Sequence, residues 1–68
     1  MSVAKVTEII AYSNKSFDDA LKMGIARSHK TLTGLKTAWV KSQQVTLDDE
    51  GQIQQYCVTL KVTFVIED

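Results

Sequence analysis

Trp39 is the side chain of this sequence best suited to recognising a ligand, because a large rigid ring buries much area at a small entropic cost. It lies in the stretch LKTAWVKSQQ (35–44), where the neighbouring apolar residues Ala38 and Val40 have the opposite parity. Successive side chains of a strand point to opposite faces, so Trp39 should project from the face that Ala38 and Val40 do not occupy. Two interpretations stay open: the ring stacks on a ligand, or it packs at an interface between subunits.

Three other groups could do chemistry, and each has a plainer interpretation. Cys57, the single cysteine, is expected to be an inert strand residue, because the sequence identifies no helix N-terminus or base that would activate its thiol. His29 is expected at a solvated or interfacial position, since no Ser/His/Asp arrangement and no Gly-rich phosphate loop accompany it. The carboxylates at 48–50 form a solvated turn or, where loops of several subunits meet, a cation site of the oxygen-rich kind that calcium requires. We therefore expect a protein that is not an enzyme.

The size and charge of the chain restrict the class of protein to which it can belong. At 68 residues it is expected to form a single domain (1–68), which buries only about 60% of the surface of its unfolded chain. With one cysteine and no Cys/His cluster, oligomerisation is the remaining means of reinforcement. Eight basic and eight acidic residues alternate without a basic stripe, so no nucleic acid is expected as a partner. The chain has no run of about 20 apolar residues and no signal peptide at its start, so we expect a cytoplasmic location and no membrane partner.

The first half of the chain predicts a strand followed by a helix. The stretch 3–13 is rich in β-branched residues, and its even positions make the more apolar face. From 13 to 34 apolar residues recur at helical spacing, with Ser13 or Ser16 as the N-cap and Gly34 as the left-handed stop. Gly24 in the interior of the helix is expected to let the helix backbone approach the sheet closely. The apolar stripe consists of Phe17, Leu21, Ile25 and Leu32.

The second half predicts a hairpin, in which strands 35–47 and 52–67 flank the turn DDEG (48–51) and Gly51 takes a left-handed position. The register set by this turn places Trp39 opposite Lys61, on the face away from the helix. There the Lys61 ammonium could form a cation–π pair with the ring or contact a ligand phosphate. The register gives four pairs: Val40–Leu60 and Ala38–Val62 on the helix side, and Trp39–Lys61 and Thr37–Thr63 on the other side.

The order of these elements predicts an α+β fold, a β-α-β-β protomer whose three-stranded antiparallel sheet has the order 1-3-2 and wraps around one helix. One face of the sheet packs on the helix, and nothing in the chain covers the other. Val45, Leu47 and Ile53 are expected on that uncovered face, near the tip of the hairpin. An exposed apolar patch beside a tryptophan marks an interaction surface. On the helix, Met23 and Ala26 are expected to face outward, where they could serve a trimer contact.

The strings VTEIIAYSNKSFDDALKMGIARSHKTLTGL and YCVTLKVTFVIED resemble the dodecins over nearly the whole chain, including the strand–Ser–helix junction and the GIAR…KT helix. The resemblance implies a β-α-β-β protomer assembled as a hollow dodecamer with 23 symmetry. It also implies that flavins are held in pairs at two-fold interfaces, between tryptophans. The function that it implies is storage or buffering of the ligand rather than catalysis.

The positions that contact flavin in the family carry other residues here. The stacking tryptophan of a string such as LDWFEV corresponds to Thr37, the flavin-edge glutamine corresponds to Cys57, and a basic residue late in the second strand corresponds to Gln44. Trp39 lies two residues after the family's position, which keeps its face of the strand and moves the ring by about 6 to 7 Å. The ligand residues expected from the resemblance and the register are Trp39, Thr37, Cys57, Lys61 and Gln44.

Two functions follow as expectations. In the first, a dodecin-like homododecamer binds a small flat ligand of the flavin type (FMN, riboflavin or FAD) and stores or buffers it. In the second, the flavin site has been lost, and the dodecamer is a structural or cation-binding assembly, with calcium as the example.

Overall fold

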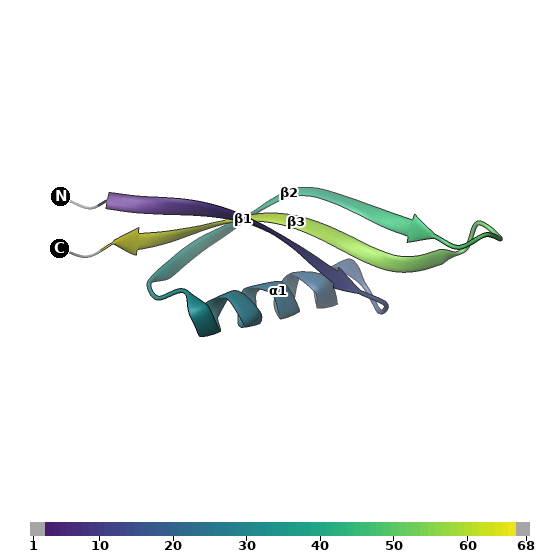
Figure 1. The fold of residues 1–68 in the computed structure, drawn as a ribbon, viewed down its shortest axis with the longest axis horizontal. Helices are drawn as coiled ribbons and strands as arrows, with labels where there is room; N and C mark the ends of the chain where they lie inside the picture. Colours follow the sequence, from purple (N-terminus) through teal and green to yellow (C-terminus); the bar gives the residue numbers. More distant parts are fainter. Residues whose placement is uncertain (1–2, 67–68) are drawn as a thin grey trace.

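The computed structural model describes residues 3–66, which form three strands and one helix (Figure 1). In chain order these are β1 (Val3–Ser13), α1 (Phe17–Thr31), β2 (Leu35–Leu47) and β3 (Ile53–Ile66). β1 and β2 both pair with β3 in antiparallel fashion, which gives the strand order β1-β3-β2. The predicted β-α-β-β topology and the predicted sheet order are therefore confirmed, while the expected last residue of the second hairpin strand, 67, lies outside the described residues.

The core lies between α1 and one face of the sheet, as the alternation of β3 predicts. Val58, Leu60 and Val62 point toward the helix and are buried, and Ala20 of α1 is buried against them. β1 adds its odd positions to this face, where Ile9 and Ala11 pack against the core, together with Phe17, Leu21 and Val40. Figure 1 shows α1 running along this single face of the sheet.

The helix begins at the predicted cap and ends earlier than predicted. Ser16 Oγ accepts a hydrogen bond from Asp19 N at 2.9 Å, so Ser16 is the N-cap. Ser13 instead accepts from Lys15 N and donates its Oγ proton to Asp19 Oδ2 at 2.6 Å, which fixes the junction between strand and helix. The helix has 15 residues rather than about 20, because Leu32 is already extended and donates its N–H to Ser28 O. Including Leu32 in the helical stripe was therefore wrong.

Two glycines take the left-handed conformation that the sequence predicted. Gly51 has φ +80° in the hairpin turn. Gly34 has φ +76°, but two residues separate it from Thr31, the last residue of the helix, so it is not the immediate helix stop. Its carbonyl accepts a hydrogen bond from Val65 N at 3.0 Å, so this turn ties the start of β2 to the end of β3.

The hairpin register is as predicted from Thr37 to Val40 and shifts on both sides of this stretch. The four predicted pairs from Thr37–Thr63 to Val40–Leu60 are all present. A bulge at Lys41 then shifts the pairing by one residue, so that Val45 opposes Tyr56 on the face of the helix. The prediction that Val45 lies on the uncovered face was therefore wrong, because the hairpin has an extra residue that a regular register omits.

The tip of the hairpin reaches beyond the end of α1, which leaves it without cover from the helix (Figure 1). Leu47 and Ile53 pair with each other there, past a second irregularity after Thr46, and both are exposed. Their exposure agrees with the predicted interaction surface.

Candidate functional site

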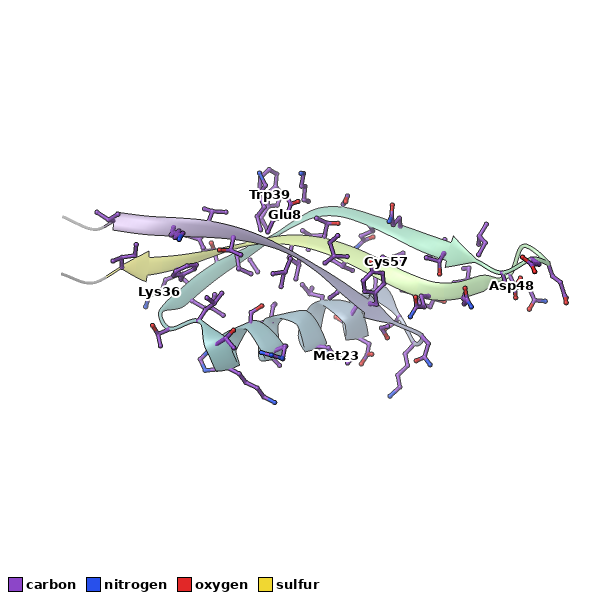
Figure 2. The ribbon with its side chains drawn as sticks, in the orientation of Figure 1. Glu8, Met23, Lys36, Trp39, Asp48 and Cys57 are labelled. Atoms are coloured by element: carbon purple, nitrogen blue, oxygen red, sulfur yellow. The ribbon has the colours of Figure 1, made fainter. Side chains whose placement is uncertain are left out.

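Trp39 projects from the face of the sheet that points away from α1. We call this face the outer face. It comprises the side chains of β1 and β3 that point away from the helix, with their partners on β2. The indole is 62% exposed. Figure 2 shows Trp39 and Glu8 on this side of the sheet, away from the helix. The prediction that Trp39 points away from the helix is confirmed.

Lys61 lies directly opposite Trp39 in the register, and its Nζ is 5.5 Å from the centroid of the indole ring. This distance lies within the range of about 6 Å over which an ammonium is attracted to the face of an aromatic ring. The cation–π pair that the register predicted is therefore present. It fixes the ammonium next to the largest exposed aromatic surface of the chain.

A second lysine and a glutamate, which the sequence analysis did not single out, complete this end of the outer face. Glu8 of β1 opposes Lys61 in the β1–β3 register, and its Oε1 lies 3.0 Å from Lys41 Nζ. Lys41 is the extra residue of the bulge. The composition of the strand carries no signal for a bulge, which is why sequence reasoning missed this ion pair.

The five predicted ligand residues form two groups on the outer face rather than one. Thr37 lies two residues from Trp39 on the same strand and faces Thr63, so it belongs with Trp39 and Lys61. Cys57 and Gln44 oppose each other four residues farther along β3, which is about 13 Å away.

The bulge at Lys41 determines the position of Gln44. Without the extra residue, Gln44 would oppose Tyr56 on the helix side; with it, Gln44 opposes Cys57 on the outer face. Cys57 itself is 1% exposed and lies between Gln44 and Tyr12 of β1. Its burial agrees with the expectation of an inert strand residue and leaves its thiol little access to a ligand.

Apart from Glu8, the outer face of β1 is apolar, and no part of the described chain covers it. Val6, Ile10 and Tyr12 are 54%, 53% and 51% exposed, whereas the odd residues between them pack on the core. The even positions, which the sequence identified as the more apolar ones, thus lie on the side away from the helix. Exposed apolar patches of this kind mark interaction surfaces.

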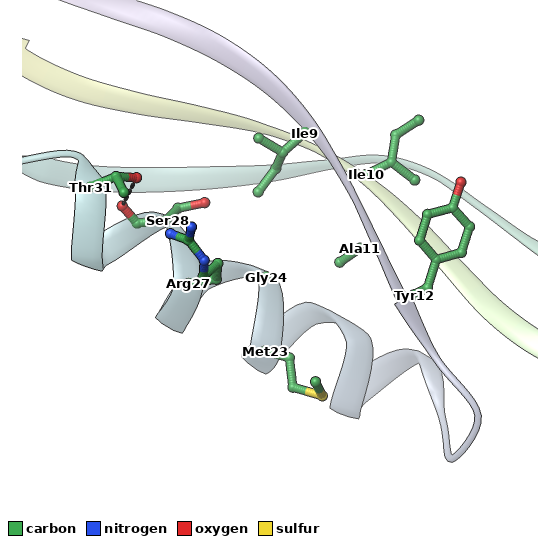
Figure 3. Close-up of a pocket in the computed structure, with 9 residues that line it drawn as sticks. All are labelled: Ile9, Ile10, Ala11, Tyr12, Met23, Gly24, Arg27, Ser28 and Thr31. Carbon is green, nitrogen blue, oxygen red and sulfur yellow. Dashed lines mark hydrogen bonds between the residues drawn. The ribbon is translucent and has the colours of Figure 1, made fainter.

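A groove of about 420 Å³ runs between α1 and the free edge of β1 (Figure 3). Its walls are mostly apolar, and Arg27 contributes the one charged side chain among the residues that line it. Met23, which the sequence placed on the outward side of the helix, is exposed and forms part of this wall. Ala11 and Gly24 also line the groove, and strand and helix approach closely there, since a Cβ atom at Gly24 would lie 2.9 Å from Ala11 Cβ.

The acidic turn is organised by hydrogen bonds to its own backbone. Asp48 Oδ1 accepts from Glu50 N and from Gln52 N, each at 2.9 Å, so this carboxylate closes the turn. Within residues 3–66 no group of three or more His, Cys, Asp and Glu side chains is placed to hold a metal ion.

The remaining predicted positions are quickly placed. His29 is exposed and lines a second groove of about 290 Å³, between α1 and β2, as a solvated or interfacial residue would. Of the residues that the structure describes, those in helical conformation do not form a segment long and apolar enough to cross a membrane.

The comparisons with known proteins agree with this architecture. The family model described as Dodecin matches residues 3–67. A dodecin from Streptomyces davaonensis has a similar solved structure, with 34% identity, a TM-score of 0.91 and coverage of 98% of this chain and 97% of the other. A variant of the T. thermophilus dodecin has 31% identity, a TM-score of 0.91 and complete coverage of both chains. A calcium dodecin from Mycobacterium tuberculosis, described as having a novel calcium-binding site, has 30% identity, a TM-score of 0.84 and coverage of 97% and 93%. A search of curated proteins found no match.

Proposed function

We propose, from the premise that the chain belongs to the dodecin family, that the protein forms a homododecamer. This homododecamer binds a flat aromatic ligand of the flavin type. In this proposal the chain is one dodecin domain (1–68) acting in the cytoplasm, and it stores or buffers the ligand without catalysing a reaction. Trp39 stacks on the ring, while Thr37 and Lys61 contact its border. Gln44, about 13 Å farther along the outer face, contacts an extended ligand or a neighbouring subunit's share of the site, whereas burial leaves the Cys57 thiol beside it little access to the ligand.

The observation that carries this proposal is the exposed indole of Trp39 on a face that its own chain leaves open. An aromatic side chain of this size offers up to about 250 Å², so 62% exposure corresponds to about 150 Å². A flat ring stacked on one face covers about half of that area, which is worth about 2 kcal/mol before the costs of binding. Such a gain suits a ligand with an extended ring system and does not require a catalytic group.

The fit of a flavin to the residues present is good for stacking and poor for recognition of the ring edge. The open indole supplies the stacking surface. The position that corresponds to the family's glutamine holds Cys57, which is 1% exposed and carries only a weak hydrogen-bonding group. We therefore expect affinity to come from ring stacking and from the charged groups near Trp39.

Assembly is supported by the apolar surfaces that the chain leaves uncovered. The outer face of β1 and the groove between β1 and α1 both present apolar side chains to solvent. The free edge of β1 offers further unpaired backbone groups. Neighbouring copies of the chain would cover these surfaces in a closed assembly.

Two measurements test the proposal. Light scattering should give twelve times the chain mass of 7.6 kDa, about 91 kDa. Titration with FMN, riboflavin and FAD should quench flavin fluorescence, and Trp39→Leu, which keeps an apolar side chain without a stacking ring, should abolish the quenching while the mass stays at the dodecamer value. Lys22→Leu, on the exposed side of α1, serves as the control and should leave both unchanged. A mass near that of one chain, or unchanged flavin fluorescence with the unmodified protein, would contradict the proposal.

A second candidate is a dodecamer that has lost flavin binding and is structural or binds a cation such as calcium. The observation that favours it is the buried thiol at position 57, together with Thr37 and Gln44 at the other two positions where the family contacts flavin. Its calcium site would lie where carboxylates of several chains meet, because one chain does not bring three together within residues 3–66. Calcium titration by calorimetry after removal of bound ions, with Asp49→Asn and Glu50→Gln as variants, separates this candidate from the first.

A further inference from the structure

The face of the indole that a ligand would need is partly occupied by the chain itself. Lys61 Nζ lies 5.5 Å from the centre of the Trp39 ring, and the two residues are direct cross-strand partners. A flat ligand that stacks on this face must displace the ammonium. A ligand on the opposite face still lies within reach of the four-carbon side chain of Lys61.

The charges around Trp39 favour an anion. Glu8 lies across β3 from Trp39 and is paired with Lys41 at 3.0 Å, so this carboxylate already has a cation. Within residues 3–66 the ion pairs are Lys41–Glu8 and Lys22–Asp18, so no described carboxylate lies within 4 Å of Lys61. Two lysines and one glutamate leave one positive charge in excess beside the stacking surface.

From this arrangement we propose that Lys61 exchanges partners when a ligand binds: the ligand ring replaces the ammonium on Trp39, and the ammonium pairs with an anionic group of the ligand. This inference rests on the proposed function and narrows it to flat rings that carry a phosphate or a carboxylate. A neutral ring displaces the ammonium and offers it nothing in return. An anionic ring restores its pairing, and an ammonium that binds an anion forms a stronger, charge-assisted hydrogen bond.

The hydroxyl groups next to this site fit the same ligand class. Thr37 and Thr63 face each other two residues beyond Trp39 and Lys61 on the outer face. Hydroxyl groups donate readily to phosphate and carboxylate oxygens. The anionic group would therefore lie near Lys61 toward the Thr37–Thr63 pair.

The test uses three ligands that share one ring system: FMN with a phosphate, an N10-carboxymethyl flavin with a carboxylate, and riboflavin with neither. At 50 mM salt we expect FMN to bind at least tenfold more tightly than riboflavin, with the carboxymethyl flavin between them. Dissolved ions screen a solvent-exposed charge pair, so the ratio of FMN affinity to riboflavin affinity should fall at 500 mM salt. In Lys61→Met, which keeps the length of the side chain without its charge, the FMN-to-riboflavin ratio should fall to near one while riboflavin binds as well as before or better.

Two control variants make the result specific to Lys61. Lys61→Arg retains the charge and should retain the preference for FMN. Lys22→Met removes a lysine on the far side of the molecule and should leave the ratio unchanged. If FMN and riboflavin bind equally to the unmodified protein, or if Lys61→Met keeps the full ratio, the inference is wrong and the proposed function stands. If none of the three flavins binds, both are wrong.

Discussion

The substitution Gly24→Ala tests the close contact between α1 and β1 on which the core depends. A Cβ atom added at Gly24 would lie 2.9 Å from Ala11 Cβ and 3.3 Å from Leu60 Cδ1. Carbon atoms in good contact are about 3.5 to 4.0 Å apart, so the new methyl group would overlap its neighbour on β1. Because both atoms sit directly on backbones, the helix must move away from the sheet to relieve the overlap.

Two effects of opposite sign determine the magnitude. Replacing glycine by alanine inside a helix stabilises it by about 1 kcal/mol. Inserting a methyl group into a packed core costs about 1 to 3 kcal/mol. We therefore expect Gly24→Ala to lower the free energy of unfolding by about 1 kcal/mol, although its helix propensity alone would raise it.

The assay is urea denaturation followed by far-ultraviolet circular dichroism, at several protein concentrations so that dissociation of an assembly is separated from unfolding. The decisive measurement is a double-mutant cycle with Ala11→Gly, which removes the overlapping methyl group on β1. In that background Gly24→Ala should become stabilising by up to about 1 kcal/mol. If Gly24→Ala stabilises the unmodified protein, or if the cycle shows no coupling, the helix is not held against β1 as described.

Three further predictions concern the helix cap, a turn and the outer face. Ser16→Ala should cost about 1 kcal/mol of stability in urea denaturation, because it removes the cap of α1, whereas Ser16→Asp should cost little. Gly34→Ala should lower the stability more than Gly51→Ala in the same assay. Both glycines have positive φ, which costs about 1 to 2 kcal/mol for alanine. Only the Cβ atom at position 34 would also meet a backbone atom, Val65 O at 2.9 Å. Ile10→Glu should leave a folded chain by circular dichroism while the mass from light scattering falls below 91 kDa, and Ile10→Thr should keep the assembly; an intact Glu variant would show that this face is not an interface.

The parts of the fold that the sequence predicted are those set by local periodicity and by glycine. Gly51 fixed the turn from which the central register follows, and that register placed Leu60 and Val62 on the helix side, where both are buried. The register in turn placed Trp39 opposite Lys61. Each of these predictions depends on a short, regular pattern, and each is confirmed.

The features of the fold that the sequence did not predict are those in which a regular pattern is interrupted. The bulge at Lys41 inserts a residue into a strand whose composition is otherwise ordinary, and it alone shifts Val45 to the helix side and Gln44 to the outer face. The helix ends before Leu32 because the chain must turn toward β2, although the apolar spacing continues past the last helical residue. Both interruptions are set by tertiary contacts that the local sequence does not encode.

For the candidate site, the sequence predicted the orientation of Trp39 and its pairing with Lys61, and the resemblance supplied Thr37, Cys57 and Gln44. The structure separates these positions, with Thr37 and Lys61 near the ring and Cys57 with Gln44 about 13 Å away. Distance along a strand could have been counted from the sequence. The burial of Cys57 between its two cross-strand neighbours could not, since it depends on the packing of β1 against β3.

The proposed assembly and the proposed ligand binding should be thermodynamically linked, because both use the surface that the helix leaves uncovered. A helix of 15 residues is about 22 Å long, whereas the molecule extends over 53 Å, so α1 cannot cover even one face of the sheet completely. The uncovered apolar residues of the outer face lie on the same surface as Trp39. A ligand that binds there only in the assembled state stabilises the assembly by RT ln(1 + [L]/Kd), or about 2.7 kcal/mol at a hundredfold excess over Kd. The concentration of protein at which the dodecamer dissociates should therefore fall when ligand is added, and a ligand site confined to one chain would not produce this shift.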